Sequence, residues 1–313
     1  MSVKIINVTH KPCSALNSDT IVTINAGRAC ASQASKDGVL SAEQLQWLLK
    51  NTLSDATGDN ISRSNRFYNE MTAIYWAWKN YDKLGNPSAF GIMHYRRHFI
   101  LKNKIRISGN YLADMGFTND NLDKLTNQYD IIHPRFMDIK NKNFIDCIGE
   151  EYCTLGGNKM KQAIKLALDI IKERDFANYE QVSSVLNSRQ TGSFCNMFIM
   201  KKDLFFEYCD WIFPILFELD KRLGRDYERG QERCIGWTAE MLTSIFIYLH
   251  SKTHSHKEVF VFENTPACLK SKLKILSWKL KLPFVGEEKR KKYLARIYNY
   301  LLFTKYSLET VKL

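Results

Sequence analysis

The sequence lacks the glycine-rich loops that hold phosphate groups in many nucleotide-binding proteins. Neither a Walker-type loop nor a dinucleotide-binding fingerprint occurs among its 15 glycines. No two of its eight cysteines have Cys-x-x-Cys spacing, so we expect reduced, mostly buried thiols rather than a zinc site. No apolar run reaches the roughly 18–20 residues of a membrane-spanning helix, and the first ten residues do not form a secretory signal. These absences favour a cytoplasmic protein that is soluble or peripheral to a membrane.

Positive charge is concentrated near the carboxyl end of the chain. The formal net charge is +12, and residues 266–313 contain ten lysines and two arginines against three glutamates. The rest of the chain carries little net charge, so no basic stripe for nucleic acid runs through it. We therefore predict one catalytic domain at residues 1–264 and a basic helical tail at residues 265–313.

Within this tail, lysines recur among leucine, isoleucine and tryptophan from Leu269 to Leu282. This pattern is typical of an amphipathic helix that lies on an anionic lipid surface. A solvated helical hairpin packed on the domain would have the same composition. We expect the tail to hold the protein on the inner face of the cytoplasmic membrane.

The pattern of the main body predicts strands that alternate with helices. Short apolar runs predict strands at residues 3–8, 19–25, 89–93, 129–133, 194–201 and 259–262. Apolar residues three or four positions apart predict helices at residues 41–50, 67–81, 121–128, 157–174, 202–223 and 233–249. This alternation indicates an α/β sheet covered on both faces, in which ligands bind outside the carboxyl ends of the strands.

The segment from Thr57 to Arg97 is unusually dense in polar and aromatic residues. Its motifs and those that follow are Thr57–Ser62, Asn69–Thr72, Tyr75–Asn80, His94–Arg97, Tyr129–Ile132, Asn196–Lys201, Gln231–Arg233 and Gly236–Leu242. This set, in this order, resembles a family of bacterial capsule and O-antigen galactofuranosyltransferases over about residues 3–264.

The resemblance implies a glycosyltransferase of the A-type fold, with a Rossmann-like domain that binds a nucleotide sugar. It further implies transfer of galactofuranose from UDP-galactofuranose, with inversion, onto a lipid-linked O-antigen or capsule glycan. Two other functions fit parts of the sequence: the same fold with another nucleotide sugar, or a non-enzymatic, membrane-associated protein that binds polyanions. The last would explain the tail but not the segment from Thr57 to Arg97.

The departing diphosphate of such a donor needs positive charge. Many A-type transferases supply it with a divalent metal on an Asp-x-Asp motif, but strand 89–93 ends in His94-Tyr95-Arg96-Arg97. Guanidinium groups match phosphate oxygens bidentately, so we expect Arg96 and Arg97, with His94, to replace the metal. We predict no cofactor, while Mg²⁺ or Mn²⁺ at Asp59 stays open because hard cations prefer carboxylate oxygens. The arginines could instead form a surface ion-pair cluster.

Further donor contacts are predicted around the strand ends. The candidates are His10, Lys11, Asp59, Asn60, Tyr95 and Glu70. His10 and Lys11 end the first strand, and Asp59 lies in a natural tight turn. Glu70 would orient one of the arginines. Plain turn chemistry at Asp59 and an ordinary loop at His10 are the alternatives.

An inverting transfer also needs a carboxylate that accepts the proton of the acceptor hydroxyl. Glu240 is the candidate because it lies in a largely apolar helix, where partial desolvation would raise its pKa. It could instead pair with Arg233, and Glu232 and Asp210 are the reserve candidates. Asn196 sits in an apolar strand and needs a polar partner if buried, so we group it with Glu232 and Arg233 as acceptor contacts.

Overall fold

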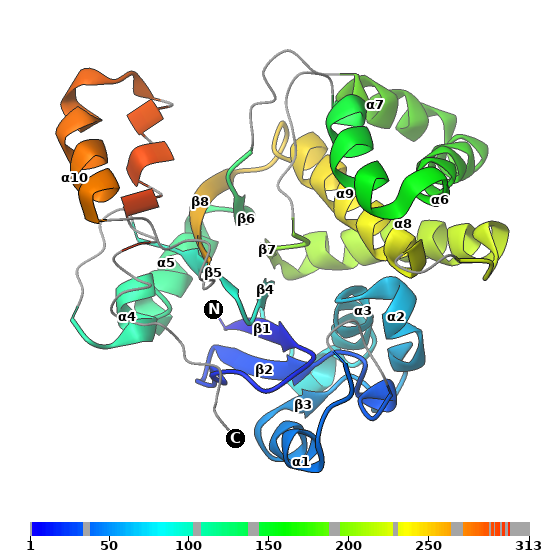
Figure 1. The fold of residues 1–313 in the computed structure, drawn as a ribbon, viewed down its shortest axis with the longest axis horizontal. Coiled ribbons are helices and arrows are strands. Elements are labelled where there is room, and N and C mark those ends of the chain that lie inside the picture. The colour runs from blue at the N-terminus through cyan, green and yellow to red at the C-terminus, as the bar shows by residue number, and fades with distance from the viewer. Residues whose placement is uncertain are drawn as a thin grey trace.

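The computed structural model describes residues 2–33, 38–102, 108–136, 144–187, 195–227, 231–263 and 272–287, with scattered positions up to 300. Its strands are β1 (Val3–Thr9), β2 (Ile21–Asn25), β3 (Leu53–Ser54), β4 (Ala89–His94), β5 (Arg97–Ile100), β6 (Ile131–Pro134), β7 (Phe198–Lys201) and β8 (His256–Glu263). Its helices are α1 (Ala42–Asn51), α2 (Asn65–Tyr68), α3 (Met71–Lys79), α4 (Tyr111–Met115), α5 (Asn119–Gln128), α6 (Phe144–Arg174), α7 (Phe176–Leu186), α8 (Lys202–Leu223), α9 (Cys234–His250) and α10 (Lys272–Lys281). Figure 1 shows their arrangement.

The first half of the sheet is parallel. β1 pairs with β2 and with β4, and β3 extends the sheet beyond β2. Because these strands run in one direction, their carboxyl ends meet at the same edge, where α/β proteins bind ligands. The loops that leave β1, β2 and β4 therefore start side by side.

The second half of the sheet closes on itself. β4 pairs antiparallel with β7, and the pairing continues through β6, β8 and β5 back to the end of β4. The link that closes the ring is a hairpin contact between His94 and Arg97. The sheet that was expected to be Rossmann-like is thus a mixed sheet, in which three parallel strands join a closed ring of five.

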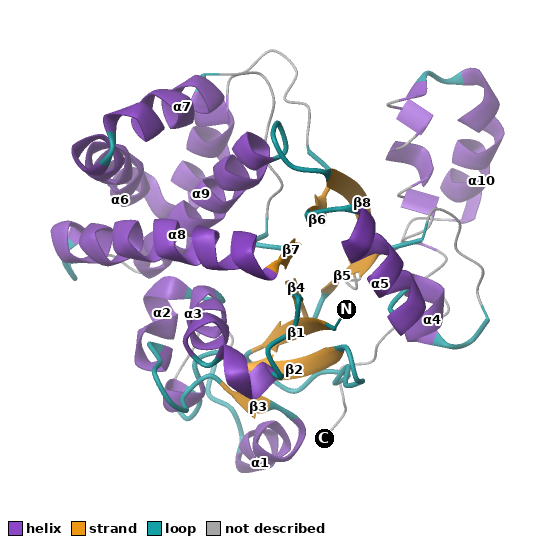
Figure 2. Cartoon of the chain, turned by 180° about the vertical axis from the view of Figure 1, so that it is seen from behind, coloured by secondary structure: helices purple, strands orange, loops and turns teal. Residues whose placement is uncertain are grey.

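Helices cover both faces of the sheet, as the alternating pattern predicted. Figures 1 and 2 show α6, α7, α8 and α9 gathered on one side of the strands, with α4 and α5 on the other. One buried cluster joins α3, α6, α8 and α9 to the sheet, and a second joins α4 and α5 to the opposite face. Burial of apolar side chains on both faces holds the strand edge in place.

Several local predictions are confirmed and others are wrong. Ser41 caps α1 with a capping box, and the long helix 202–223 is present as α8. The aromatic helix predicted at 67–81 is instead two helices, because Asn69 has a positive φ of 51° and stops α2. β5 and α7 were not predicted. β5 is short, and its pairing partner β8 lies far away in the sequence.

The tail contributes α10, which lies away from α6–α9 in both views (Figures 1 and 2). The aromatic rings of Trp278 and Tyr293 stack with centroids 6.2 Å apart, so α10 packs against the segment that follows it. In the part of the chain that is described, no helix combines the length and apolar character needed to cross a membrane.

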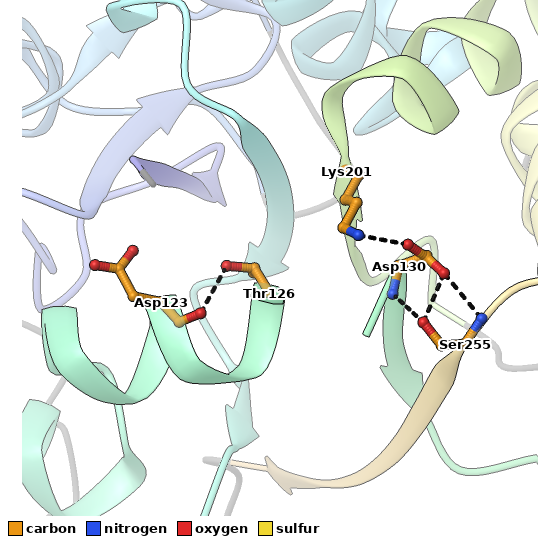
Figure 3. Close-up of polar contacts among 5 residues, drawn as sticks. All are labelled: Asp123, Thr126, Asp130, Lys201 and Ser255. Carbon is orange, nitrogen blue, oxygen red and sulfur yellow. Dashed lines mark hydrogen bonds and ion pairs between the residues drawn. The ribbon is translucent and has the colours of Figure 1, made fainter. Parts of the chain in front are cut away.

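Asp130 ties three strands together at the edge opposite the carboxyl end of β4 (Figure 3). Its carboxylate accepts hydrogen bonds from the backbone N–H and the hydroxyl of Ser255, at 2.9 and 2.6 Å, just before β8. Lys201, at the end of β7, forms an ion pair with it at 2.7 Å. Burial acts to raise the pKa of Asp130, but the hydrogen bonds from Lys201 and Ser255 outweigh it and lower the pKa to about 2.

We predict that Asp130→Asn lowers the free energy of unfolding at pH 7 by about 1 kcal/mol, because a hydrogen-bonded carboxylate is lost. A lowered pKa in the folded state stabilises the protein above the unfolded pKa of about 4 and ceases to do so as the pH falls through about 2. The deficit of the variant should therefore shrink between pH 4 and pH 2 in urea-unfolding curves. A deficit that is constant down to pH 2, or equal to that of the exposed-site control Asp82→Asn, contradicts this role.

Candidate functional site

Basic side chains gather around the ring of Tyr95 at the carboxyl edge of β1 and β4. Tyr95 directly follows β4, and its backbone N–H donates a hydrogen bond to the carbonyl oxygen of Val8 in β1. The ring of His10 meets it edge-on, with centroids 5.6 Å apart. The Lys11 ammonium and the Arg96 guanidinium lie 5.9 and 5.1 Å from its centroid. Four predicted site residues thus lie together, and their cations suit an anionic ligand.

His94 ends β4 at the place where β7 no longer covers that strand. β7 begins opposite Ile92, so His94 meets the loop that enters β7, and its Nε2–H donates to the carbonyl oxygen of Cys195 at 2.5 Å. Burial lowers the pKa of His94, and this effect outweighs the charge of Glu70, which acts to raise it. The imidazole is therefore neutral at neutral pH, with its proton on Nε2 and a lone pair on Nδ1.

The turn that enters β7 is strained. Cys195 and Asn196 have positive φ values of 81° and 48°, a region that non-glycine residues seldom occupy. The backbone N–H of Cys195 donates to the carboxylate of Glu240 in α9. Burial, reinforced by the charge of Glu240, raises the pKa of the Cys195 thiol to about 12, so it stays protonated. One peptide turn thus joins two predicted catalytic residues, His94 and Glu240.

The side chain of Asn196 brings a second carboxylate to this turn. Its Nδ2 donates to Oε1 of Glu70 at 2.8 Å, and its Oδ1 accepts from the Thr243 hydroxyl at 2.7 Å. Thr243 in turn lies 2.8 Å from the hydroxyl of Tyr208. Asn196 is fully buried, and these bonds supply the polar partners that it needs. We call Glu70, His94, Arg97, Cys195, Asn196 and Glu240 the carboxylate–imidazole cluster.

Arg97 pairs with an acidic residue of a distant strand. It is the first residue of β5, and its guanidinium forms an ion pair with Glu263 of β8 at 3.2 Å. Burial acts to lower its pKa, but nearby acidic groups, among them Glu263 and Glu240, raise it. Arg96 instead lies exposed at the tip of the hairpin. β4 therefore ends at His94 and Arg97 begins the next strand, while the role of Arg97 toward the diphosphate stays a prediction.

The break between α2 and α3 positions the predicted acceptor residues. Arg233 donates from Nε to Oδ1 of Asn69 at 3.1 Å, and Glu232 forms an ion pair with Arg66 at 2.5 Å. Gly236 lies so close to the Asn69 side chain that a Cβ at this position would be 1.9 Å from its Nδ2. Only glycine allows this approach, which fixes the residue directly before Glu70.

Asp59 and Asn60 lie in a turn with its own partners. The side-chain carboxylate of Asp59 accepts a hydrogen bond from the hydroxyl of Tyr75 at 3.1 Å. The backbone carbonyl oxygen of Asp59 accepts one from the side chain of Asn80 at 2.8 Å. Asn60 donates from Nδ2 to the carbonyl oxygen of Gly58, whose φ is +61°. These contacts support turn chemistry, and a ligand or metal role for Asp59 stays a prediction.

A buried carboxylate below the strand edge was not predicted from the sequence. Asp55 accepts hydrogen bonds from the backbone N–H groups of Gly27 and Arg28, at 2.7 and 3.0 Å, in the loop that follows β2. It also accepts from the hydroxyls of Ser62 and Thr72, at 2.6 and 2.7 Å. Asp55 thereby fixes the β2 loop to the start of the Thr57–Arg97 segment. The sequence signal that could have found Asp55 is the polar segment that follows the predicted helix at residues 41–50.

The charges at this edge are arranged in two parts. Lys11 and Arg96 place positive charge around Tyr95, while Glu70 and Glu240 place two carboxylates on either side of the β7 turn. Across the residues whose positions are given, no group of three or more His, Cys, Asp or Glu side chains could hold a metal ion. The arrangement can hold an anionic ligand beside a carboxylate that accepts a proton.

Comparison with known proteins gives a family and a structural relative. The family model described as domain of unknown function (DUF4422) matches residues 4–252. The apo structure of WbbM, a bifunctional glycosyltransferase, is similar with a TM-score of 0.68 and 27% sequence identity. The similarity covers 83% of this chain and 45% of the WbbM chain, so this chain spans less than half of that protein. The comparison with curated proteins gave no match.

We predict that Gly236→Ala lowers the free energy of unfolding by about 1–3 kcal/mol, because the new methyl group would overlap the Asn69 side chain. Gly286→Ala is the matched control, since a Cβ there meets no atom within 4 Å. Urea unfolding of both variants measures the difference. If the two variants have equal free energies of unfolding, the Asn69 side chain can move away from the new methyl group without loss of stability.

Proposed function

We propose that this chain, which belongs to the DUF4422 family, is a glycosyltransferase of the A-type fold that transfers a hexose from a nucleotide sugar. The observation that carries the proposal is the carboxylate–imidazole cluster beside the cations around Tyr95, at the carboxyl edge of parallel strands. The similarity to a bifunctional glycosyltransferase supports the same reaction class.

The donor binds with its diphosphate near Tyr95. Arg96 is exposed next to that ring and, with Lys11, provides positive charge for the phosphate oxygens. Arg97, which forms an ion pair with Glu263, adds further positive charge near the phosphate oxygens. His10, Asp59 and Asn60 remain proposed contacts to the nucleotide or its sugar.

The transfer step places the acceptor hydroxyl next to Glu240. The hydroxyl oxygen attacks the anomeric carbon while the bond from that carbon to the diphosphate oxygen breaks. The proton of the hydroxyl passes to the Glu240 carboxylate, and the diphosphate leaves with the electron pair of the broken bond. Attack on the face opposite the leaving group inverts the configuration. Neutral His94 holds the Cys195 turn and thereby positions Glu240.

The finer assignment is transfer of galactofuranose from UDP-galactofuranose onto a lipid-linked O-antigen or capsule glycan. Its support is the set of motifs between Thr57 and Glu240 and their resemblance to galactofuranosyltransferases. Glu232 and Arg233 are the proposed acceptor-side residues, and Asn196, whose amide is satisfied inside the protein, is proposed to position Glu70 beside them. The charges at the strand edge would serve another nucleotide sugar equally well, so the donor sugar rests on the resemblance alone.

The tail is proposed to hold the protein on an anionic membrane surface, at the cytoplasmic face. Leu276, Leu280 and Phe284 are 54%, 65% and 86% exposed, and the first two are four residues apart on one face of α10. Lysines lie among them, Lys279 and Lys281 in the last turn. Exposed apolar side chains with neighbouring lysines favour the interface of an anionic bilayer, where a lipid-linked acceptor resides.

We predict that Glu240→Gln lowers kcat about 10²–10⁴-fold, because the proton acceptor is lost while the donor site is unchanged. The assay incubates the full chain with UDP-galactofuranose and a lipid-like synthetic acceptor and quantifies the disaccharide product. Glu180→Gln, at an exposed position of α7, is the matched control and should keep full activity.

The same proteins test the donor site without turnover. UDP should raise the melting temperature of the wild type and of Glu240→Gln alike, and EDTA should not abolish the rise. Arg96→Ala should diminish the rise, whereas Arg290→Ala should not. If UDP leaves the wild-type melting temperature unchanged, the proposed donor site is wrong; a rise that EDTA abolishes indicates a metal site.

We predict that replacing Leu276, Leu280 and Phe284 by Ser releases the protein from vesicles that contain phosphatidylglycerol, because the apolar contact with the bilayer is lost. Deletion of residues 266–313 should do the same. Co-sedimentation measures the effect, and Leu49→Ser, at another exposed leucine, is the control. Continued sedimentation of the truncated chain with the vesicles would refute the membrane role of the tail.

A further inference from the structure

A groove lies among the helices that cover one face of the sheet. It is lined by α7, α8 and α9 and has a volume of about 670 Å³. A second hollow of about 320 Å³ continues it and shares Asn178, Asp210 and Trp211. None of the residues placed in the donor site or in the carboxylate–imidazole cluster lines either hollow. The groove is therefore a separate feature of the molecule.

The groove combines flat apolar rings with polar groups. Trp211 is half-buried and packs against Phe246, with centroids 5.7 Å apart, and Phe246 stacks on His250 at 3.8 Å. Exposed carboxylates of Glu207 and Asp210 stand beside these rings. Glu207 also bonds to His250 Nε2 at 3.0 Å, which fixes its direction.

The other wall supplies amide groups. Asn178 and Gln181 of α7 line the groove opposite α8. The side-chain carbonyl oxygen of Asn178 is buried and has no hydrogen-bond partner among the described residues. Gln181 is exposed, and its amide group can donate to and accept from the hydroxyl groups of a ligand.

These groups match the two kinds of surface of a sugar. A pyranose or furanose ring has C–H groups on its faces, which pack on aromatic rings, and hydroxyl groups at its edge, which donate to carboxylates and amide oxygens. Among the described lining residues, Asp203, Glu207 and Asp210 outnumber the basic Lys202 and His250, so negative charge is in excess, and Arg174 and Asp175 of the adjoining hollow offset each other. Phosphate groups and anionic lipids are therefore disfavoured, whereas a neutral glycan is not.

The groove lies well away from the proposed transfer site. In α9, the groove-lining residues Phe246 and His250 follow Glu240 by six and ten positions, about 9 and 15 Å at the rise of an α-helix. In the sheet, Lys201 pairs with Ala89, five residues from His94, which is about 17 Å along a strand. A sugar in the groove would therefore not be the sugar that receives the transferred hexose.

We propose that this groove binds a segment of neutral hexose glycan, at a distance from the point of transfer. The proposal rests on the proposed function, because a transferase that extends a glycan has its product chain available as a ligand. A distal site of this kind makes long acceptors bind more tightly than short ones. It adds acceptor affinity without taking part in the reaction.

The test measures binding of a galactose hexasaccharide and of the corresponding disaccharide to the full chain by calorimetry. The hexasaccharide should bind the wild type, and Asp210→Asn and Trp211→Ala should each weaken it at least about tenfold, the loss of one good contact. Asp82→Asn and Trp47→Ala, at an exposed turn and in α1, are the matched controls. Asp210→Asn changes an exposed side chain, so its effect does not depend on packing.

Parallel measurements separate this proposal from the proposed function. The UDP-induced rise in melting temperature and the turnover of the disaccharide acceptor should be unchanged in Trp211→Ala. Hexasaccharide binding that is absent, or equal in all variants, overturns the groove proposal even if transfer is observed. Binding that requires Asp210 and Trp211 without any transfer activity overturns the proposed function instead. If an oligolysine peptide binds the groove and the hexasaccharide does not, the site recognises cationic protein rather than glycan.

Discussion

The chain enters β7 through two residues with positive φ, and the peptide groups of the first of them bind His94 on one side and Glu240 on the other. Such backbone conformations cost on the order of 1–3 kcal/mol each, and they persist only where surrounding contacts fix them. Here the antiparallel pairing of β7 with β4 fixes one end, and the helix α9 fixes the other. The relative position of imidazole and carboxylate depends on this turn.

A third residue with positive φ leads to the same turn. Asn69 stops α2 and starts α3, and the residue after it, Glu70, accepts a hydrogen bond from Asn196 in the β7 turn. Gly236 permits the close approach of Asn69 to α9. The strained break at Asn69 and the strained β7 turn are therefore linked by the part-buried hydrogen bond from Asn196 to Glu70. Groups that are fixed in this way do not have to be ordered when a ligand arrives.

The two adjacent arginines have become different in their surroundings. Arg97 forms an ion pair with Glu263, which lies 166 positions further along the chain. The negative charge of Glu240 also acts on the Arg97 guanidinium and raises its pKa. Arg96 stands exposed above Tyr95. Positive charge that faces an incoming anion is thus separated from positive charge that stabilises the carboxylates. This separation lets two carboxylates lie near one another while an anionic ligand still meets a basic surface.

Local features of the fold were predictable because their causes lie within a few residues. The capping box of Ser41 starts α1, and an apolar spacing of three or four residues carries α8 from Lys202 to Leu223. The polar residues after β1 and β4 met at one edge because parallel strands place their carboxyl ends together. The sequence alone thus predicted the neighbourhood of His10, Lys11, Tyr95 and Arg96.

What only the tertiary structure decided depends on contacts between distant residues. The helical spacing of the sequence continues through Asn69, so no local signal predicted the break at this residue. In the structure, Asn69 has a positive φ and Gly236 packs against its side chain. Likewise β5 has little length of its own and forms by pairing with β8, which closes the ring and draws Arg97 into the sheet. The pairing of β5 with β8 and the conformation of Asn69 involve partners more than a hundred residues away, and a pattern read along the chain does not contain them.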